Sequence, residues 1–578
     1  MKRFISLLFV LLALSAKAQT PLTVFETSNG LKTATYEEAI TYYQQLAKDN
    51  EEINIQEIGL TDSGFPLHLV TLDLDKDFDF KKSYDKGKTI ILINNGIHPG
   101  EPDGIEASMM LLRNYVQQAD KKELVKNIVI AVIPIYNIGG ALNRNSFSRA
   151  NQDGPEDYGF RGNARNFDLN RDFIKADTRN TKAFYEVFHK VNPDIFIDTH
   201  VSNGADYQYT ITHLATQHNK MGGALGDYIL SEFTPQIEQK MKARNCEITP
   251  YVNVFNTPPD QDGFSQFLDQ PRYSTGYTAL FNTLGFMIET HMLKPFKVRV
   301  ESTYSFLESV IEIAQNDGAK IRELKLARQQ EYKPGTKHAL DWRLTRSEST
   351  QITFKGYEGE KVTSTVTGQE RLYYNRDKPF TKTLSYYNTF VPTEEMTIPK
   401  AYIIPQGWYK VIDLLKLNNV AFKRLSQDSS INVEVYKIDK FNTSKTVYEG
   451  HYTNNNVKVI ASNETVNFRK GDYIISTDQP AARYLFETLE PAGADSFFSW
   501  NFFDTILQQK EYFSPYVFED QAQQLLDAEP ELRKEFNKKK KEEPDFSNNW
   551  YAQLDYIYKK SPYYEAAHMR YPIYRLVD

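Results

Sequence analysis

The sequence predicts an α/β fold in which a mixed, mainly parallel sheet is flanked by helices, followed by a β-rich and then helical C-terminal region. Continuous apolar runs at 89–93 and 128–135 are typical of strands buried on both faces. Amphipathic helical stretches alternate with such runs, which favours a sheet covered by helices. At Tyr332-Lys333-Pro334-Gly335 the pattern changes to short β-prone segments, so a second region is expected beyond it.

The individual elements follow from hydrophobic periodicity. Residues 38–48 have helical spacing, and 53–60 and 67–74 are expected to pair as strands around the turn Thr61-Asp62-Ser63-Gly64. Further buried strands are expected at 195–197 and 284–288, and helices at 105–116, 181–190, 222–233 and 304–330. Later expectations are strands at 351–355, 361–366, 401–404 and 433–436, and helices at 405–417 and 519–541.

The length of 578 residues exceeds what one hydrophobic core usually serves, so at least two domains are expected. We predict a signal peptide at 1–18, a first domain at 19–332 and an accessory region at 336–578. The net charge of -7 is mild and gives no electrostatic reason to expect nucleic acid as a partner, because phosphate binding needs a clustered basic surface. The sequence does not fix the oligomeric state.

The N-terminal residues predict export. Lys2 and Arg3 precede an apolar stretch at 4–15, and Ala16-Lys17-Ala18 has the small-x-small pattern of a signal peptidase site. The apolar stretch is shorter than the ~20 residues that span a bilayer, and no later run reaches that length. We therefore expect cleavage after residue 18 and a periplasmic or secreted product. The one cysteine, Cys246, rules out an intramolecular disulfide.

Two segments indicate a metal site. His98 and Glu101 lie three residues apart across a Pro-Gly turn that follows the strand at 89–93, where ligands bind in open α/β sheets. His200 ends the apolar strand around 195–197 and offers a third ligand. Two imidazoles and a carboxylate leave one coordination position open, as in catalytic zinc sites. The alternatives are an incidental surface pair and a histidine that only ends its strand.

Other polar residues suit peptide hydrolysis. Glu289 ends the apolar strand at 284–288, where burial raises a carboxyl pKa and suits a general base. Asn170 and Arg171 offer an amide and a planar fork to a peptide's free carboxylate. Arg149 is a candidate for stabilising the oxyanion. The alternatives are a rim carboxylate paired with a cation for Glu289, and surface ion pairs for the two arginines.

With these motifs in this order, residues from about 35 to 320 resemble the zinc metallocarboxypeptidases of the carboxypeptidase A type, here in an exported, bacterial-like form. The two-His, one-Glu zinc set is already known from carboxypeptidase A itself. The resemblance implies a carboxypeptidase-like sheet, one zinc ion per chain and a peptide substrate. It also implies roles for particular residues: zinc ligation by His98, Glu101 and His200, general base catalysis by Glu289, carboxylate binding by Asn170 and Arg171, and oxyanion stabilisation by Arg149.

Two features of the family are not matched clearly. Its substrate-binding tyrosine has Tyr273 and Tyr277 as candidates, with Arg272 as a further substrate contact, and the residue that sets side-chain preference is not identified. The expected function is removal of C-terminal residues from peptides. One alternative is a zinc amidase or deacylase, similar to the aspartoacylase and succinylglutamate desuccinylase group, acting on acylated amino acids or cell-wall peptides. Another is a non-catalytic peptide- or glycan-binding protein.

Overall fold

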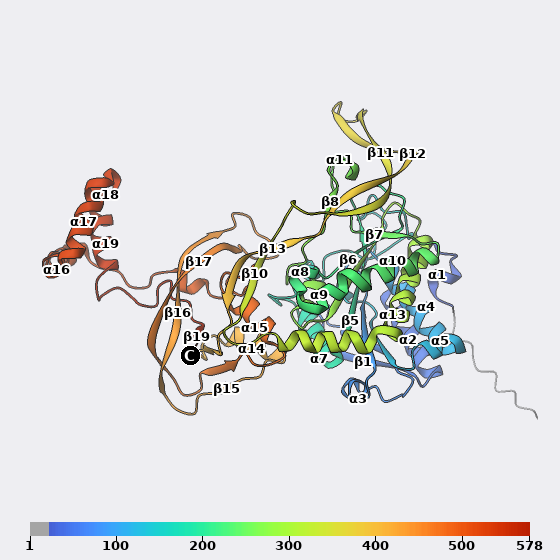
Figure 1. Ribbon diagram of the computed structural model, residues 1–578, viewed down its shortest axis with the longest axis horizontal. Coiled ribbons are helices and arrows are strands. Elements are labelled where there is room, and N and C mark those ends of the chain that lie inside the picture. Colours follow the sequence, from blue (N-terminus) through green and yellow to red (C-terminus); the bar gives the residue numbers. More distant parts are fainter. Residues whose placement is uncertain (1–21, 578) are drawn as a thin grey trace, which may run out of the picture.

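The computed structural model describes residues 22–577, so the predicted signal peptide at 1–18 lies outside the described residues. Figure 1 shows two large parts side by side: an α/β part built from the first half of the chain, and a part rich in strands from which a group of helices projects. This arrangement confirms the predicted fold class. Among residues 22–577, no helix is both long and apolar enough to cross a bilayer.

One mixed sheet forms the centre of the α/β part. Its strand order is β1-β2-β4-β3-β5-β9-β6-β7. The strands are β1 (Ile53–Leu60), β2 (Pro66–Leu72), β3 (Thr89–Asn94), β4 (Ile128–Ile133), β5 (Ile195–Ser202), β6 (Ile211–Ala215), β7 (Ile248–Pro250) and β9 (Leu284–His291). The four inner strands β4, β3, β5 and β9 are parallel, whereas β1 and β2 pair antiparallel at one edge and β6 runs antiparallel to β9. The parallel centre brings the carboxyl ends of these four strands to one edge of the sheet.

Helices cover one face of this sheet. They are α2 (Tyr36–Asp49), α4 (Asp103–Gln117), α9 (Gly223–Tyr228), α10 (Thr234–Ala243) and the long α13 (Phe296–Gln330). Along β3, Ile91 and Ile93 pack into the core under these helices, while Ile90 and Leu92 pack into the core on the other face. Successive side chains of a strand point to opposite faces, which explains why a doubly covered strand is apolar throughout. The helix expected at 304–330 begins earlier, at Phe296, with Pro295 as its N-cap.

The other face of the sheet is covered by α7 (Arg179–Val191) and by the strand-rich part of Figure 1, which is called the C-terminal part below. Its core is continuous with that of the C-terminal part, since the rings of Phe281 and Tyr484 stack with centroids 5.6 Å apart. The hydroxyl of Tyr277 also donates to Asn418 Oδ1 at 2.7 Å. The helix α13 ends near the expected boundary at 332–336, but apolar packing crosses that boundary, and the division into two domains stays a prediction.

The C-terminal part contains a six-stranded sheet of order β15-β18-β14-β19-β16-β17. Its strands are β14 (Ala401–Ile404), β15 (Lys423–Arg424), β16 (Ser429–Thr443), β17 (Asn454–Phe468), β18 (Tyr473–Ser476) and β19 (Tyr574–Leu576), packed with helices α14 (Tyr409–Leu417) and α15 (Ala482–Leu489). A separate pair is formed by β10 (Lys337–Leu344) and β13 (Phe390–Thr397). The helix α14 after β14 agrees with the expected strand and helix at 401–417.

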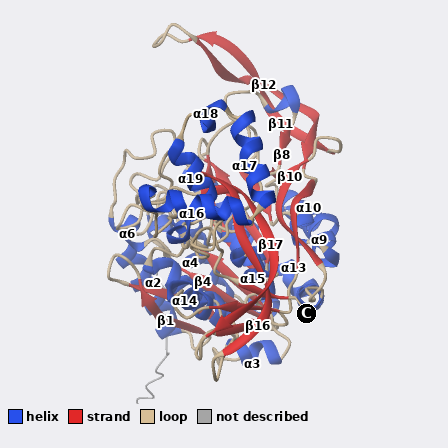
Figure 2. Ribbon diagram, turned by 90° about the vertical axis from the view of Figure 1, so that its left-hand side faces the viewer, coloured by secondary structure: helices blue, strands red, loops and turns tan. Residues whose placement is uncertain are grey.

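A long hairpin projects from the body in Figures 1 and 2. It consists of β11 (Thr350–Thr363) and β12 (Glu370–Tyr387), and β12 also pairs with the short β8 (Phe264–Ser265). The segments expected as strands at 351–355 and 361–366 are therefore mostly one strand, β11, because its pairing with β12 continues through residues 356–360.

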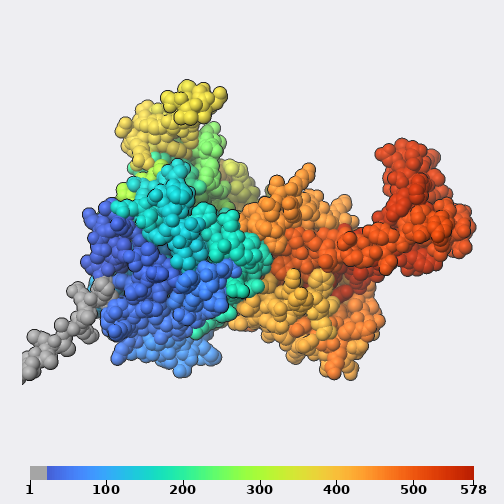
Figure 3. Space-filling view, turned by 180° about the vertical axis from the view of Figure 1, so that it is seen from behind, coloured from blue at the N-terminus to red at the C-terminus, as the bar shows by residue number. Residues whose placement is uncertain are grey.

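The helices after residue 514 form an appendage with its own apolar cluster (Figure 3). They are α16 (Pro515–Ala528), α17 (Pro530–Glu542), α18 (Pro544–Ser547) and α19 (Trp550–Lys559). The helix expected over 519–541 is divided into two, because Pro530 begins α17.

Candidate active site

Three parallel strands position the polar residues that the sequence singled out. The loop after β3 carries His98 and Glu101, while His200 lies on β5 and Glu289 on the adjacent β9. His200 and Glu289 are register partners between those strands. The site therefore lies at the carboxyl ends of the strands, where open α/β sheets bind their ligands.

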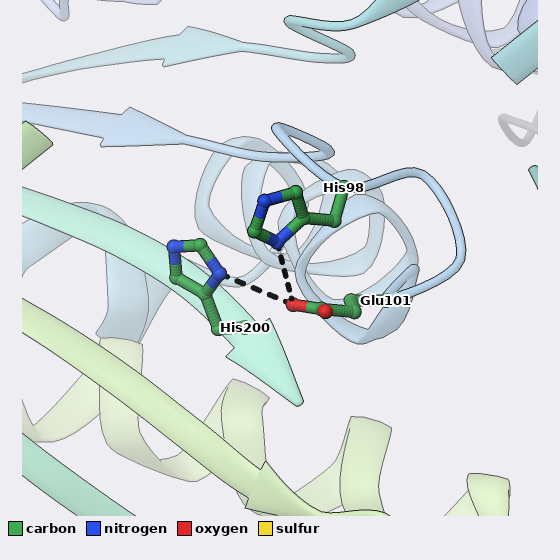
Figure 4. A group of neighbouring side chains, drawn as sticks. All are labelled: His98, Glu101 and His200. Atoms are coloured by element: carbon green, nitrogen blue, oxygen red, sulfur yellow. Dashed lines mark hydrogen bonds and ion pairs between the residues drawn. The ribbon is translucent and has the colours of Figure 1, made fainter. Parts of the chain in front are cut away.

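His98, Glu101 and His200 converge (Figure 4). The Nδ1 atoms of His98 and His200 lie 3.3 and 3.1 Å from the same oxygen, Oε2 of Glu101. All three side chains are buried, and one potential ligand atom from each falls within 4.8 Å of the others. Between residues 22 and 577, no other group of three His, Cys, Asp or Glu side chains comes together in this way.

Two carboxylates hold the outer edges of the imidazoles. His98 Nε2 lies 3.0 Å from Asp168 Oδ1, and His200 Nε2 lies 2.9 Å from Asp198 Oδ2. A carboxylate beside Nε2 favours the tautomer with the proton on that nitrogen, which turns the Nδ1 lone pair inward, where that of His98 also lies 3.3 Å from NH1 of Arg161. Asp198 is itself fixed, because the amide of Asn94 donates to it at 3.0 Å.

This donor set fits a zinc ion. Two Nδ1 lone pairs and one carboxylate oxygen meet at a buried point, and each imidazole has the outer hydrogen bond that metal-bound histidines commonly make. Burial opposes ionisation of Glu101, but the charges of His98 and Arg149 hold its pKa well below the usual range. Glu101 is therefore held as the carboxylate that metal binding requires.

Glu289 stands beside this cluster and is partly exposed to the cleft. Burial raises the pKa of Glu289 to about 7, with His200 opposing the rise and the charge of Glu101 adding to it. A carboxyl group that titrates near neutral pH is able both to accept and to return a proton. The geometry therefore places a suitable general acid-base group next to the candidate metal site.

A cleft of about 740 Å³ opens over these residues. The predicted site residues that line it are His98, Glu101, Arg149, Asn170, Arg171, His200, Tyr273 and Glu289. Leu214, Met287 and Phe267 add apolar surface to its wall. A concave site with a few convergent polar groups on a partly apolar wall is typical of a binding site for a small molecule or a chain end.

Asn170 and Arg171 lie together on one side of the cleft. The guanidinium carbon of Arg171 lies 4.5 Å from the ring centroid of Tyr273, a cation–π contact that orients the fork. The side-chain oxygen of Asn170 accepts from the backbone nitrogen of Ser274 at 3.0 Å, which fixes the amide. The side chain of Arg171 remains 23% exposed, so its charge can be reached from the cleft.

Arg149 crosses the loop that carries the candidate ligands. Its NH1 donates to Glu101 Oε1 at 2.9 Å, and its Nε donates to Gln152 at 2.6 Å. A glycine at position 100 permits this approach, because a Cβ there would lie 2.6 Å from Arg149 Cδ. The guanidinium is thus held at the rim of the candidate metal site.

Two predicted substrate contacts do not reach the cleft. Arg272 is turned toward Asp495, which accepts from its backbone nitrogen at 2.8 Å and from its Nε at 3.1 Å. Tyr277 is fully buried in helix α12 (Ser274–Ala279), where its hydroxyl bonds Asn418. Their partners come from distant sequence, and neither Arg272 nor Tyr277 lines the cleft.

Among the cleft residues that sequence reasoning did not single out are Arg161 and Tyr251. Arg161 donates to Asp168 Oδ2 from Nε at 3.0 Å and from NH2 at 2.8 Å, and it extends into the cleft. Tyr251 follows the short strand β7 and lines the cleft. Burial, with a further effect of the Glu289 charge, raises the pKa of Tyr251, so its hydroxyl stays protonated. The position of Tyr251 directly after a strand was the available signal, whereas Arg161 lies in a loop without one.

The known proteins to which this chain is similar include carboxypeptidases. Residues 39–193 match the family described as Zinc carboxypeptidase. Carboxypeptidase 2 of Trichophyton rubrum is 22% identical over 428 residues, covering 72% of this chain and 74% of the relative. Carboxypeptidase 2 of Trichophyton equinum is 23% identical over 494 residues, covering 82% and 85%.

Among solved structures, a metallo-carboxypeptidase from Burkholderia cenocepacia is similar with a TM-score of 0.37 and 14% identity, covering 49% of this chain and 70% of its own. The family match contains His98, Glu101 and Asn170, whereas His200 and Glu289 follow it along the chain. Residues 39–193 therefore match a zinc carboxypeptidase domain, and the curated relatives that resemble most of the chain are carboxypeptidases.

Proposed function

We propose that this protein is a zinc-dependent carboxypeptidase that removes C-terminal residues from peptides, with one zinc ion held by His98, Glu101 and His200. The observation that carries the proposal is the convergence of two imidazole Nδ1 atoms on Glu101 Oε2, at 3.3 and 3.1 Å, beside a glutamate that titrates near neutral pH. When bound there, zinc would supply Lewis acidity that activates water and polarises the peptide carbonyl.

Glu289 is proposed as the general base. Its carboxylate faces the cleft beside His200, so it can take a proton from the attacking water and later deliver it to the departing nitrogen. Arg149 is proposed to stabilise the negative oxygen that develops on the carbonyl, because its charge is fixed beside Glu101 at the rim of the cleft.

Asn170 and Arg171 are proposed to bind the free carboxylate of the substrate. A planar guanidinium and an amide match the geometry of a carboxylate, and both line the same cleft as Glu289. Tyr273 supports Arg171 and is proposed to contact the terminal residue. A site that requires a free carboxylate cuts only at the chain end, which makes the enzyme an exopeptidase.

A peptide library and mass spectrometry test this proposal. We expect stepwise loss of single C-terminal residues, complete inhibition by a chelator, recovery with zinc, and no cleavage of peptides with an amidated C-terminus. Internal cuts, or activity confined to acylated amino acids, would contradict it and would favour an endopeptidase or a deacylase.

Export is also proposed, from the signal-peptide pattern at 1–18. The mature protein should then begin at Gln19 and be recovered from the periplasm or the medium. N-terminal sequencing of the natural product checks this, and a product that retains residues 1–18 would refute it.

A further inference from the structure

The loop 444–453, which joins β16 to β17, reaches the α/β part next to the candidate metal site. Oε2 of Glu449 accepts a hydrogen bond from the backbone nitrogen of Asp168 at 3.0 Å. The side chain of the same Asp168 lies 3.0 Å from His98 Nε2. One backbone hydrogen bond therefore connects the C-terminal part to the carboxylate that orients a candidate ligand.

The tip of this loop is held in place on both sides of Glu449. Backbone hydrogen bonds of 2.8 and 3.0 Å join Tyr448 and His451 in a tight turn. Nε2 of His451 also lies 2.8 Å from Asp177 Oδ2, in the segment that follows Asp168. Glu449 has a φ of 48°, a left-handed conformation that is uncommon for a residue with a side chain. The tight turn and the contact with Asp177 fix this conformation and direct the carboxylate at the Asp168 nitrogen.

A second contact supports the proposed carboxylate-binding side. Asp495 is buried, and it accepts from the backbone nitrogen and Nε of Arg272. The guanidinium of Arg272 also lies 5.2 Å from the ring centroid of Trp500 and 5.6 Å from that of Tyr448. These contacts fix residue 272 between aromatic rings of the C-terminal part.

The two residues after Arg272 contact the residues proposed to bind the substrate carboxylate. The ring of Tyr273 lies 4.5 Å from the guanidinium carbon of Arg171, and the backbone nitrogen of Ser274 donates to Asn170 Oδ1 at 3.0 Å. A shift of Arg272 would move Tyr273 and Ser274 with it, and so change the direction of both side chains proposed to bind the substrate carboxylate.

We propose that the C-terminal part completes the active site through two positioning residues. Glu449 positions Asp168, and through it His98, while Asp495 positions the 272–274 segment, and through it Asn170 and Arg171. This inference rests on the proposed function, because it concerns the zinc and carboxylate sites named there. The two contacts act on different properties: the first on zinc affinity, the second on the Michaelis constant for peptides.

Zinc affinity tests the first contact. Groups that orient metal ligands typically contribute about 10–100-fold in affinity. Glu449 contacts such a group, Asp168, rather than the ligand itself. We therefore expect Glu449→Ala to weaken zinc binding by less, about 5- to 10-fold. Glu449→Gln keeps an acceptor oxygen and should bind zinc nearly as the wild type does. Thr446→Ala, at an exposed position of the same loop, is the matched control. Zinc is titrated into the apoprotein against a chromophoric chelator, and equal affinity for Glu449→Ala and Thr446→Ala overturns this contact.

Steady-state kinetics test the second contact. Asp495→Asn removes the charge that holds Arg272, and we expect KM for a peptide with a free C-terminus to rise several-fold while kcat changes less than KM does. If Asp495→Asn does not fold, Arg272→Lys gives the same test. Lysine keeps the positive charge but lacks the planar guanidinium that bonds Asp495 and packs against the rings of Trp500 and Tyr448. An unchanged KM in the folded variant overturns this contact.

The wild-type protein separates failure of this inference from failure of the proposed function. If the wild type neither binds zinc nor trims peptides, the proposed function is wrong. If the wild type does both, and the variants at 449 and 495 behave as Thr446→Ala does, only the positioning role of the C-terminal part is wrong.

Discussion

Glu289 and His200 occupy paired positions on neighbouring strands. This pairing places the proposed acid-base group beside the candidate metal site. Because strands β5 and β9 are parallel and in register, the distance between the two side chains is set by the sheet rather than by a loop. Sites supported by regular elements keep their geometry better than sites on loops. Substitutions at these positions should therefore change chemistry without changing the fold.

Replacement of the general base is the first test at the scale of single residues. Glu289→Gln keeps the size of the side chain but cannot accept a proton, so we expect kcat to fall by about 10²–10⁴-fold, the usual contribution of such a group. The zinc content should stay at one per chain, as measured by elemental analysis. Glu57→Gln, an exposed carboxyl on β1, is the control. Full activity of Glu289→Gln would exclude Glu289 as the base.

The carboxylates behind the imidazoles give a second test. Asp198→Ala removes the partner of His200 Nε2, so the imidazole loses its fixed tautomer and we expect zinc affinity to fall by about 10–100-fold. Chelator competition at constant pH measures the loss. Unchanged affinity would show that Asp198 does not orient His200.

The sequence indicates the central residues of the site more reliably than its periphery. His98, Glu101 and His200 lie next to strand ends, and the structure brings them together as expected. Arg272 and Tyr277 belong to the same short motif, but their partners Asp495 and Asn418 lie 223 and 141 residues further along the chain. A motif shows which residues lie near a strand end. It does not show which distant side chain will bind them and so keep them out of the cleft.

At the scale of elements, the boundaries of the inner strands and of α2, α4 and α7 follow from hydrophobic periodicity. The helix α4 begins just after Glu101 and packs its buried face under the sheet. For the hairpin, periodicity indicated the two ends of β11 but not its middle or β12, because only part of the hairpin, around Phe354, Leu384 and Tyr386, is buried against the body. Elements that surround the site were predictable because both their faces are covered.

A buried glutamate on α4 predicts how stability depends on pH. Oε1 of Glu106 accepts from Thr33 Oγ1 at 2.9 Å and from the Ala34 nitrogen at 2.6 Å, while Oε2 has no hydrogen-bond partner. Burial raises the pKa of Glu106 to about 7 from an ordinary value of 4.5. The folded state thus retains a proton that the unfolded state has lost, and its stabilising effect is present below pH 4.5 and disappears as the pH rises through 7.

Glu106→Gln should remove this pH dependence. Relative to the wild type, we expect the variant to gain up to about 3 kcal/mol of unfolding free energy between pH 4.5 and 8, since each pKa unit corresponds to about 1.4 kcal/mol. Urea denaturation at pH 5 and pH 8 measures the difference. The exposed Glu57→Gln serves again as control, and parallel pH profiles for wild type and Glu106→Gln would contradict the argument.

At the scale of the whole molecule, one apolar core joins the α/β part to the six-stranded sheet. Phe281 from the first part stacks on Tyr484 from the second, and Tyr277 bonds Asn418 within this core. Sequence patterns show which face of an element is apolar but not which element will cover it, so this shared core could not be predicted. The appendage of α16 to α19 differs, because it has a separate cluster of its own.

Calorimetry tests this difference. We expect the α/β part and the six-stranded sheet to unfold in one transition, because separating them would expose their common core to water. The helical appendage should melt separately and at lower temperature, since a small cluster buries little apolar surface. Two resolved transitions for the two large parts, assigned by limited proteolysis, would contradict the prediction.

The position of β19 sets an order for the assembly of the second sheet. This strand lies between β14 and β16, although more than a hundred residues separate it from either. During synthesis β14 and β16 emerge long before β19, which must enter between them. The edges of β14 and β16 that face each other therefore stay open to other chains until then. Until residues 574–576 have been added, we therefore expect these facing edges to favour association with other chains.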